Sequence, residues 1–428
     1  MNEEIILILK TQVAKKFGGP IVKQKDIKIL HENINEVINA NIGFNTLRRF
    51  YGRLPSTSPN INTLNTLSKY VGFSSFVAFN KHNQKDEMFV NWHRVNEIEI
   101  AGEISELDII WLANTTSLDN YFMLLSSIIK EFIITRNVKA LYKIYSTEVL
   151  FEIPRYKLNK IANIAGSWFR EYKIEELDIL IPILSLVNFR TNFLYLHVDY
   201  QRINGYYGWM LQHSIPELVN DDEKLFTKLI LNLTLFLNTK NSGENLFNET
   251  VPQNCHPILY GRYWGYQLLY FKGDEFDTVL AAFMLVVNTQ EMKVEFFHEV
   301  FWILIIIKRI DIIEQIINLH YEELYEKKYW DHSNKINGHL IGQSFMHLKA
   351  KESELANNCL SFIDFESHNV GSNREYMKLF YNIAKYNYLK LSNGTTEELK
   401  LVKDDYISCV ESMQFRFFTV EFMENYFD

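Results

Sequence analysis

No set of residues in this sequence has both the types and the spacing of a known catalytic motif. His298-Glu299 opens the HExxH pattern of zinc enzymes, but Trp302 stands where the second histidine is required. Ser167 and Ser344 each follow glycine-containing stretches that lack the GxSxG spacing of a nucleophilic serine. We therefore expect no enzymatic activity, no metal ion and no cofactor.

Basic side chains that could bind an anion are concentrated near the N-terminus. Residues 1–85 contain twelve Lys and Arg against five Asp and Glu, a net charge of +7, and because the whole chain carries −8, residues 86–428 carry −15. A basic module on an acidic body favours an anionic partner, nucleic acid first. A solvated basic face without a partner is the alternative.

Composition indicates which elements must position these side chains. Hydrophobic residues make up 47% of the 428 residues and charged residues 22%, which is typical of a packed globular protein. Glycine (17) and proline (8) are scarce, so the turns of an all-β or doubly wound α/β fold are missing. We predict an all-α protein.

Five short helices are expected in the basic segment. Apolar spacings of three and four predict helices over 5–17, 25–39 and 44–51, and Asn60 is a candidate N-cap for the next helix, which ends near Gly72. Ser74 is expected to cap a last short helix with Phe76 and Phe79 on its packing side. Residues 1–85 would then form one small bundle.

The run from Ile42 to Phe73 resembles the helix-turn-helix domain of the phage-repressor (Cro/C1-like) type. The similarity covers roughly 50 residues when the helix at 25–39 is included, with 44–51 in the place of the recognition helix. In such domains the second helix of the motif lies in the major groove of DNA. The resemblance therefore implies duplex DNA as the partner of this segment.

The predicted DNA-binding residues fall into two groups. Arginine can bind guanine and asparagine can bind adenine at base edges, so the exposed side of the recognition helix is assigned base contacts; phosphate contacts are assigned to basic residues around it. The base-facing candidates are Asn45, Thr46, Arg48 and Arg49, and the phosphate-facing candidates are Lys28, Arg53 and Lys69, with Lys23 and Lys25 beside them. The alternative is a bundle of the same shape that makes only protein contacts.

From about residue 100 to the end the sequence consists of long apolar, aromatic-rich segments separated by short polar breaks. The segments that begin at Tyr260 and Asn337 are similar at an offset of 77 residues, which superposes Gly261 on Gly338 and Gly265 on Gly342. Two helical hairpins of about 38 residues would account for that period. Residues 100–428 therefore resemble α-α superhelical repeats of the tetratricopeptide sort, with a candidate division near 240–250.

Glycines four residues apart on a helix let a neighbouring helix approach closely, and the surrounding aromatic side chains fill the remaining space. The aromatic stretches 195–209 and 260–270 are accordingly interpreted as packing between hairpins. A groove for a peptide or protein ligand is the alternative, since helical superhelices bind such partners on their concave face. The sequence assigns no ligand-binding residue there.

Cysteine usage and hydropathy indicate in which cellular compartment the protein is expected. Cys255, Cys359 and Cys409 are far apart and odd in number, which favours buried thiols in a reducing cytoplasm over a disulfide framework. The longest apolar run, 300–307, is far short of the ~20 residues that span a bilayer, and we expect it inside a buried helix. The N-terminus lacks the pattern of a signal peptide.

Together these patterns predict a cytoplasmic DNA-binding transcriptional regulator without a membrane segment. Its helical-repeat domain would sense or recruit a peptide or protein partner, or form a homodimer that spans two half-sites. The arrangement resembles the peptide-responsive regulators of Gram-positive bacteria. The alternative function is a non-enzymatic interaction scaffold whose N-terminal bundle does not bind DNA.

Overall fold

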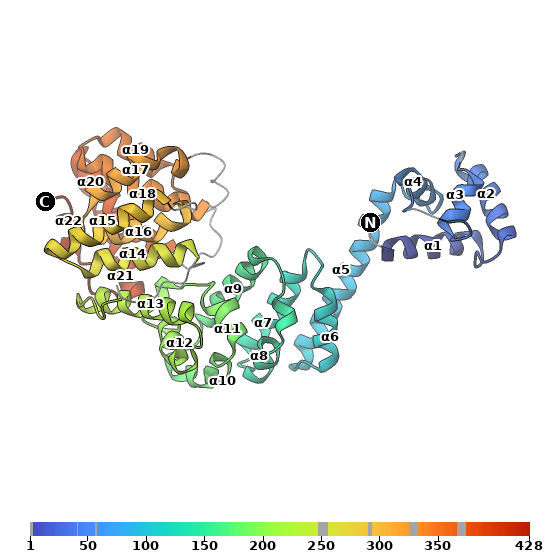
Figure 1. Cartoon of the computed structure of the whole chain (residues 1–428), viewed down its shortest axis with the longest axis horizontal. Helices are drawn as coiled ribbons and strands as arrows, with labels where there is room; N and C mark the ends of the chain where they lie inside the picture. The colour runs from blue at the N-terminus through green and yellow to red at the C-terminus, as the bar shows by residue number, and fades with distance from the viewer. Residues whose placement is uncertain are drawn as a thin grey trace. The chain divides into compact units, whose positions relative to one another are not determined.

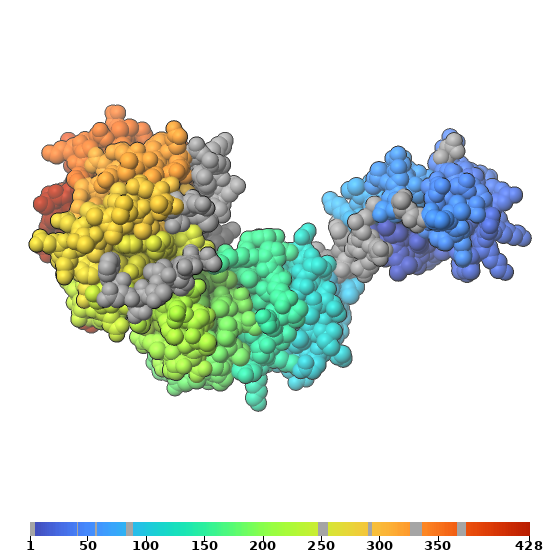
Figure 2. All heavy atoms as spheres, viewed as in Figure 1, coloured from blue at the N-terminus to red at the C-terminus, as the bar shows by residue number. Residues whose placement is uncertain are grey.

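The protein is helical throughout the part that the structure describes. The computed structural model describes residues 3–40, 42–55, 58–246, 256–289, 293–325, 333–365 and 374–428. Every regular element within these ranges is a helix, which confirms the predicted all-α class. Figure 1 shows the helices in chain order, and Figure 2 shows that side chains fill the space between their ribbons.

The chain divides into two compact units, residues Met1–Ile100 and Ala101–Asp428. The first unit contains the whole predicted basic segment and continues beyond residue 85. The candidate division near 240–250 overlaps residues 247–255, which lie outside the described residues.

The first unit is built from short helices around one apolar core. Ile27, Leu30 and Ile34 of the second helix and Leu64 and Leu67 of the fourth are fully buried in that core, as their helical spacing predicts. The second helix packs against both the third and the fourth, and the first packs against the fourth. The helices are α1 (Glu3–Phe17), α2 (Gln24–Ile38), α3 (Phe44–Phe50), α4 (Ile61–Tyr70) and α5 (Phe76–Ala101).

Local side-chain contacts fix the connections on either side of α3. Asn39 ends α2 in the left-handed conformation (φ 49°), and the backbone N–H of the buried Ile42 donates to Asn35 Oδ1 at 3.1 Å. Asn60 caps α4 by accepting from the N–H of Asn62 at 2.7 Å, as predicted. These contacts hold the segment before α3 and the start of α4. Asn41 of the predicted turn lies outside the described residues.

The last helix of this unit differs from its prediction. Helix α5 has 26 residues instead of one or two turns, and its first turn is capped by Ser75, which accepts from the N–H of Ala78 at 3.1 Å, rather than by Ser74. Val37 of α2, ten residues after the buried Ile27, is exposed. The apolar spacing of α2 continues to a position near its end that does not face the core.

The second unit begins with a set of shorter helices and short helical turns up to residue 217. Its second half, from α13 onward, has longer helices. The first set is α6 (Glu106–Thr115), α7 (Tyr121–Ile134), α8 (Val138–Tyr145), η1 (Glu148–Phe151), α9 (Arg155–Phe169), η2 (Ile174–Leu180), α10 (Ile181–Leu184), α11 (Val187–Phe189), the π-helical η3 (Arg190–Leu194), η4 (Tyr200–Arg202), α12 (Tyr206–Ser214) and η5 (Ile215–Glu217). The second set is α13 (Asp221–Thr239), α14 (Pro257–Tyr270), α15 (Gly273–Thr289), α16 (Lys293–Ile306), α17 (Ile310–Tyr325), α18 (Ser333–Lys349), α19 (Ser353–Ser361), α20 (Arg374–Leu391), α21 (Thr396–Met413) and α22 (Val420–Glu424).

Four successive helical hairpins form most of this second half. The first helices of the hairpins, α14, α16, α18 and α20, pack in sequence order against one another, and each of the second helices α15, α17, α19 and α21 contacts the first helix of its own pair. The internal similarity at 77 residues relates α14 to α18, two hairpins apart. Residues Val300–Ile306 of the apolar run are all buried in α16, as expected.

The paired glycines lie where the hairpins approach closely. A methyl group on Gly261 of α14 would stand 2.0 Å from the carbonyl oxygen of Phe296 on α16, and one on Gly338 of α18 would stand 2.9 Å from the Trp302 ring, also on α16. Helix α16 thus meets a glycine on each of its two neighbours. The predicted role of these glycines in helix packing is confirmed.

Replacing Gly261 by alanine is expected to destabilise the second unit by about 2 kcal/mol. Alanine raises helix propensity by about 1 kcal/mol, but overlap with a backbone oxygen forces α14 away from α16 and costs about 3 kcal/mol. Chemical unfolding followed by circular dichroism measures the difference. Gly265→Ala is the matched control on the same helix, because the atom nearest to its methyl group would be in the Ile303 side chain, at 3.1 Å, with the Val300 backbone no closer than 3.7 Å. Equal stability of the two variants would contradict this explanation.

Two of the three cysteines lie within the described residues. Cys359 and Cys409 are free and buried, as predicted, and burial raises the pKa of the Cys359 thiol to about 11 and that of the Cys409 thiol to about 12. Both stay protonated at neutral pH. Cys255 lies outside the described residues.

Candidate nucleic-acid interface

Helix α3 presents a polar face because its apolar residues anchor the opposite one. Leu47 and Phe50 are buried in the core of the first unit. With 3.6 residues per turn, their burial turns Asn45 and Arg49 outward, and both are exposed. Thr46 is half-buried. Of the four base-facing candidates, Asn45 and Arg49 are therefore exposed, and Thr46 and Arg48 are partly buried.

Arg48 is held by its neighbours on the same helix. Its guanidinium donates from Nη1 to Asn45 Oδ1 at 3.3 Å and lies 5.7 Å from the centre of the Phe44 ring. The Phe44 ring in turn meets His31 of α2 edge-on at 5.8 Å. The structure therefore brings Asn45 and Arg48 together as one polar pair, with a planar guanidinium fixed by contacts on two sides.

The phosphate-facing candidates lie on three different segments. Lys28 is exposed on α2, and Lys69 is exposed on α4. Arg53, just after α3, donates from Nη2 to the carbonyl oxygen of Val22, which ties the end of α3 to the loop before α2. Within the described residues no hydrogen bond or ion pair joins Lys28 or Lys69 to α3, so these two are linked to it only through the packing of their helices.

Asp26 is an acidic side chain in the first turn of α2, beside the basic candidates. Its carboxylate accepts from the backbone N–H groups of Lys23 at 2.6 Å and Val22 at 3.0 Å, and these bonds lower its pKa. The carboxylate is therefore committed to the start of α2 rather than to a neighbouring lysine side chain. Lys23, at the N-cap of α2, and Lys25, in its first turn, are both exposed.

Sequence reasoning missed the residues that support this face from behind. Lys10 of α1 lies over the Phe50 ring at 5.1 Å, and Lys16 lies over the Tyr70 ring at 5.0 Å. Asn35 holds the segment before α3. These contacts join separate helices. No spacing within a single helix could have revealed them.

No family model, curated protein or solved structure matches the chain. The case for the interface therefore depends on the geometry of these residues.

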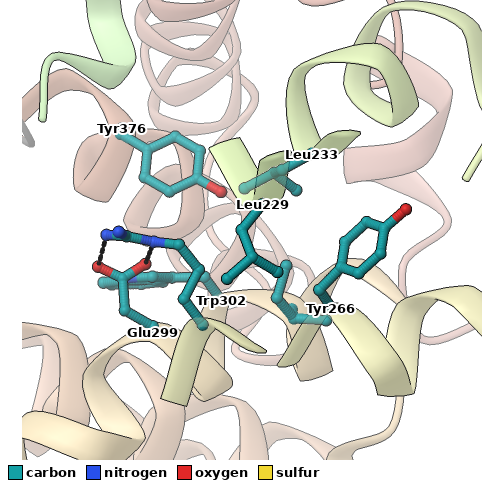
Figure 3. A pocket seen from close by; sticks show the side chains of 8 residues that line it. Leu229, Leu233, Tyr266, Glu299, Trp302 and Tyr376 are labelled. Carbon is teal, nitrogen blue, oxygen red and sulfur yellow. Dashed lines mark hydrogen bonds and ion pairs between the residues drawn. The ribbon is translucent and has the colours of Figure 1, made fainter. Parts of the chain in front are cut away.

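The second unit contains a buried polar cluster in its aromatic core. Arg262 of α14 donates from Nη2 to Glu299 Oε1 of α16 at 2.8 Å, and the Tyr200 hydroxyl donates to Glu299 Oε2 at 2.8 Å. Burial alone would raise the pKa of Glu299, but the Arg262 charge, followed by smaller contributions that include the Tyr200 hydrogen bond, lowers it overall. Figure 3 shows the carboxylate and the guanidinium facing each other, with Tyr376 nearby.

A small cavity lies beside this ion pair. It is lined by Leu229, Leu233, Arg262, Tyr266, Glu299, Trp302, Ile303 and Tyr376, and it has room for about one water molecule. The Tyr266 hydroxyl donates away from it, to the carbonyl oxygen of Glu244 at 3.0 Å. The aromatic side chains here pack between helices, and the cavity is too small for a peptide.

His298 and Glu299, the sequence neighbours considered for a zinc motif, are both buried in α16, with Glu299 committed to Arg262. In the part of the chain that the structure describes, no three His, Cys, Asp or Glu side chains are grouped so that they could hold a metal ion. Nor does any helix there combine the length and the apolar character needed to cross a bilayer.

Proposed function

We propose that the first unit binds duplex DNA, with α3 in the major groove. The observation that carries this proposal is the exposed polar face of α3, where Asn45, Arg48 and Arg49 lie on one short helix that α2 supports. Arginine and asparagine are the side chains best suited to read guanine and adenine edges. The helix-turn-helix arrangement of α2 and α3 belongs to this proposal.

Phosphate binding supplies the affinity in the same proposal. Lys23, Lys25, Lys28, Arg53 and Lys69 contact the DNA backbone on both sides of the groove, and the net positive charge of residues 1–85 favours the approach of the duplex. The second unit, with its stacked hairpins in a tetratricopeptide-like superhelix, senses or recruits a peptide or protein partner. The chain thereby acts as a transcriptional regulator.

The test is fluorescence anisotropy of the full chain against a labelled random-sequence duplex at several salt concentrations. Five phosphate contacts release counterions with a slope of log K against log salt of about −4.5, so a rise from 50 to 200 mM salt weakens binding about 500-fold. Absence of binding at 50 mM salt, or binding that does not depend on salt, would contradict the proposal. That result would favour the scaffold function, in which the bundle contacts only protein.

A further inference from the structure

Two lysine–aromatic contacts join the neighbouring helices α7 and α9 of the second unit (Figure 1). Lys130 Nζ of α7 lies 4.7 Å from the centre of the Trp168 ring of α9, and Lys160 Nζ of α9 lies 4.7 Å from the centre of the Phe122 ring of α7. Each contact joins residues 38 positions apart, so the two helices run side by side in the same direction. These four residues define the α7–α9 face.

Both lysines of the α7–α9 face lie on the solvent side of their helices. At 100° per residue Lys130 lies about 160° around α7 from the buried Ile128, and Lys160 lies about 140° around α9 from the buried Ala165. Lys160 is exposed and Lys130 is half-buried. The two contacts are eight residues apart on each helix, so the ammonium groups are separated by roughly 12 Å along the helix axes.

The two ammonium groups keep hydrogen-bonding capacity for a ligand. A ring face attracts an ammonium group, which retains N–H donors for other acceptors. Among the residues that the structure describes, no carboxylate or carbonyl oxygen bonds to either group, whereas the Lys157 ammonium donates to the carbonyl oxygen of Leu118 at 3.0 Å. Apolar surface lies beside the lysines, since Met123 is 46% exposed and Tyr156 is 57% exposed.

We propose that the α7–α9 face binds an acidic peptide segment of a partner protein, a contact that rests on the recruiting function proposed for this unit and names the chemistry of the partner. One carboxylate bonds to Lys130 and another to Lys160, while apolar side chains of the peptide cover Met123 and Tyr156. Side chains four residues apart in an extended peptide lie on the same side and about 13 Å apart, which matches the separation of the two ammonium groups.

The charge of the second unit selects a peptide over other occupants. Residues 86–428 carry a net charge of −15, so the surface around the face repels a long polyanion such as a nucleic acid, whereas a short segment with two carboxylates contacts only the two lysines. A basic partner would meet like charges. The aromatic core around Glu299 is no alternative site, because its cavity has room for about one water molecule.

Selection of random twelve-residue peptides on the immobilised full chain tests the proposal. The selected peptides are expected to carry two Asp or Glu residues four positions apart, with apolar residues beside them. The same selection on the double variant Lys130→Glu/Lys160→Glu should lose these peptides. Selected peptides that lack acidic pairs, or a selection that enriches no peptide, overturn the proposal.

Fluorescence anisotropy with the best labelled acidic peptide gives the size of the effect. Lys130→Gln and Lys160→Gln are each expected to raise the Kd about tenfold, because each leaves one carboxylate of the peptide without its ammonium partner. Lys139→Gln, at an exposed site on α8, is the matched control and should change the Kd less than about twofold.

A charge swap separates the contact from a loss of folding. A peptide with lysine in place of both acidic residues should bind the Lys130→Glu/Lys160→Glu chain and not the native chain. An acidic peptide that binds the native chain and both glutamine variants equally leaves the recruiting function in place and overturns the α7–α9 face as its site. Neither measurement contains DNA, so the result does not depend on the binding of the first unit to a duplex.

Discussion

Replacing Arg48 and Arg49 together by alanine is expected to weaken binding to duplex DNA about 100-fold at 50 mM salt. Each arginine that reaches a base edge contributes about 1–3 kcal/mol, and the two together account for the 2.7 kcal/mol that a 100-fold change represents. Arg49 is exposed on α3, and Arg48 is already oriented by Asn45 and Phe44. Fluorescence anisotropy against a labelled duplex selected for tight binding from a random-sequence pool measures the loss, because base-edge contacts form only at a matching sequence.

The matched control removes the same charge from other helices of the same unit. Lys15 of α1 and Lys81 of α5 are both exposed, and their replacement by alanine lowers only the long-range attraction, so we expect less than about a fivefold change. Circular dichroism should show that both double variants remain folded. If the two variants lose affinity equally, the arginines of α3 act only through net charge, and α3 is not the recognition helix.

Much of the first unit could be predicted from its sequence because its helices are short and are separated by turn-forming or capping residues. The predicted helices 5–17, 25–39 and 44–51 end within two residues of α1, α2 and α3, and the Asn60 cap is where it was expected. Helix α5 was the exception. After Phe79 no glycine or proline interrupts the chain until Gly102, so nothing ends the helix, although its apolar spacing weakens.

The interior of the second unit was predictable only in part. The glycines four residues apart correctly predicted that helices approach closely. A close approach requires only that one helix lacks side chains at fixed positions, and this can be read from the sequence of that helix. The ion pairs between Arg262 and Glu299 and between Arg190 and Glu223 were not predicted. The partners in each pair are 37 and 33 residues apart and lie on helices that are not consecutive in the chain, α14 and α16 in the first pair and η3 and α13 in the second. No spacing within one helix encodes such a pair.

The same limit applies to the candidate interface. Residue type and helical spacing identified Asn45, Arg48 and Arg49, and the structure places these residues on one face. No pattern in the sequence indicates that Arg53 donates to the carbonyl oxygen of Val22, because the two residues are 31 positions apart. It follows that single-helix features of a site can be read from a sequence, whereas contacts between helices cannot.

Replacing Glu299 by glutamine is expected to destabilise the second unit by about 3–5 kcal/mol at pH 7. The change leaves the buried Arg262 guanidinium without a charged partner, and an unpaired buried charge costs that much. Urea unfolding followed by circular dichroism measures the effect. Glu323→Gln is the matched control, because the ion pair of Glu323 with Lys293 has an exposed carboxylate, and its loss should cost less than about 1 kcal/mol.

Two further measurements separate the lost charge from lost packing. The double variant Arg262→Met/Glu299→Met removes both charges and should recover most of the stability, although Tyr200 loses its acceptor. The pKa of Glu299 is lowered by folding, so its stabilising contribution is present above the pKa of the unfolded side chain, about 4.5, and is lost as the pH falls through the lower folded value. The stability difference between the native chain and Glu299→Gln should therefore shrink below pH 4.5. A difference that stays constant down to pH 3 would mean that the Glu299 charge does not stabilise the fold, and that the glutamine acts by disturbing the contacts of Arg262 and Tyr200.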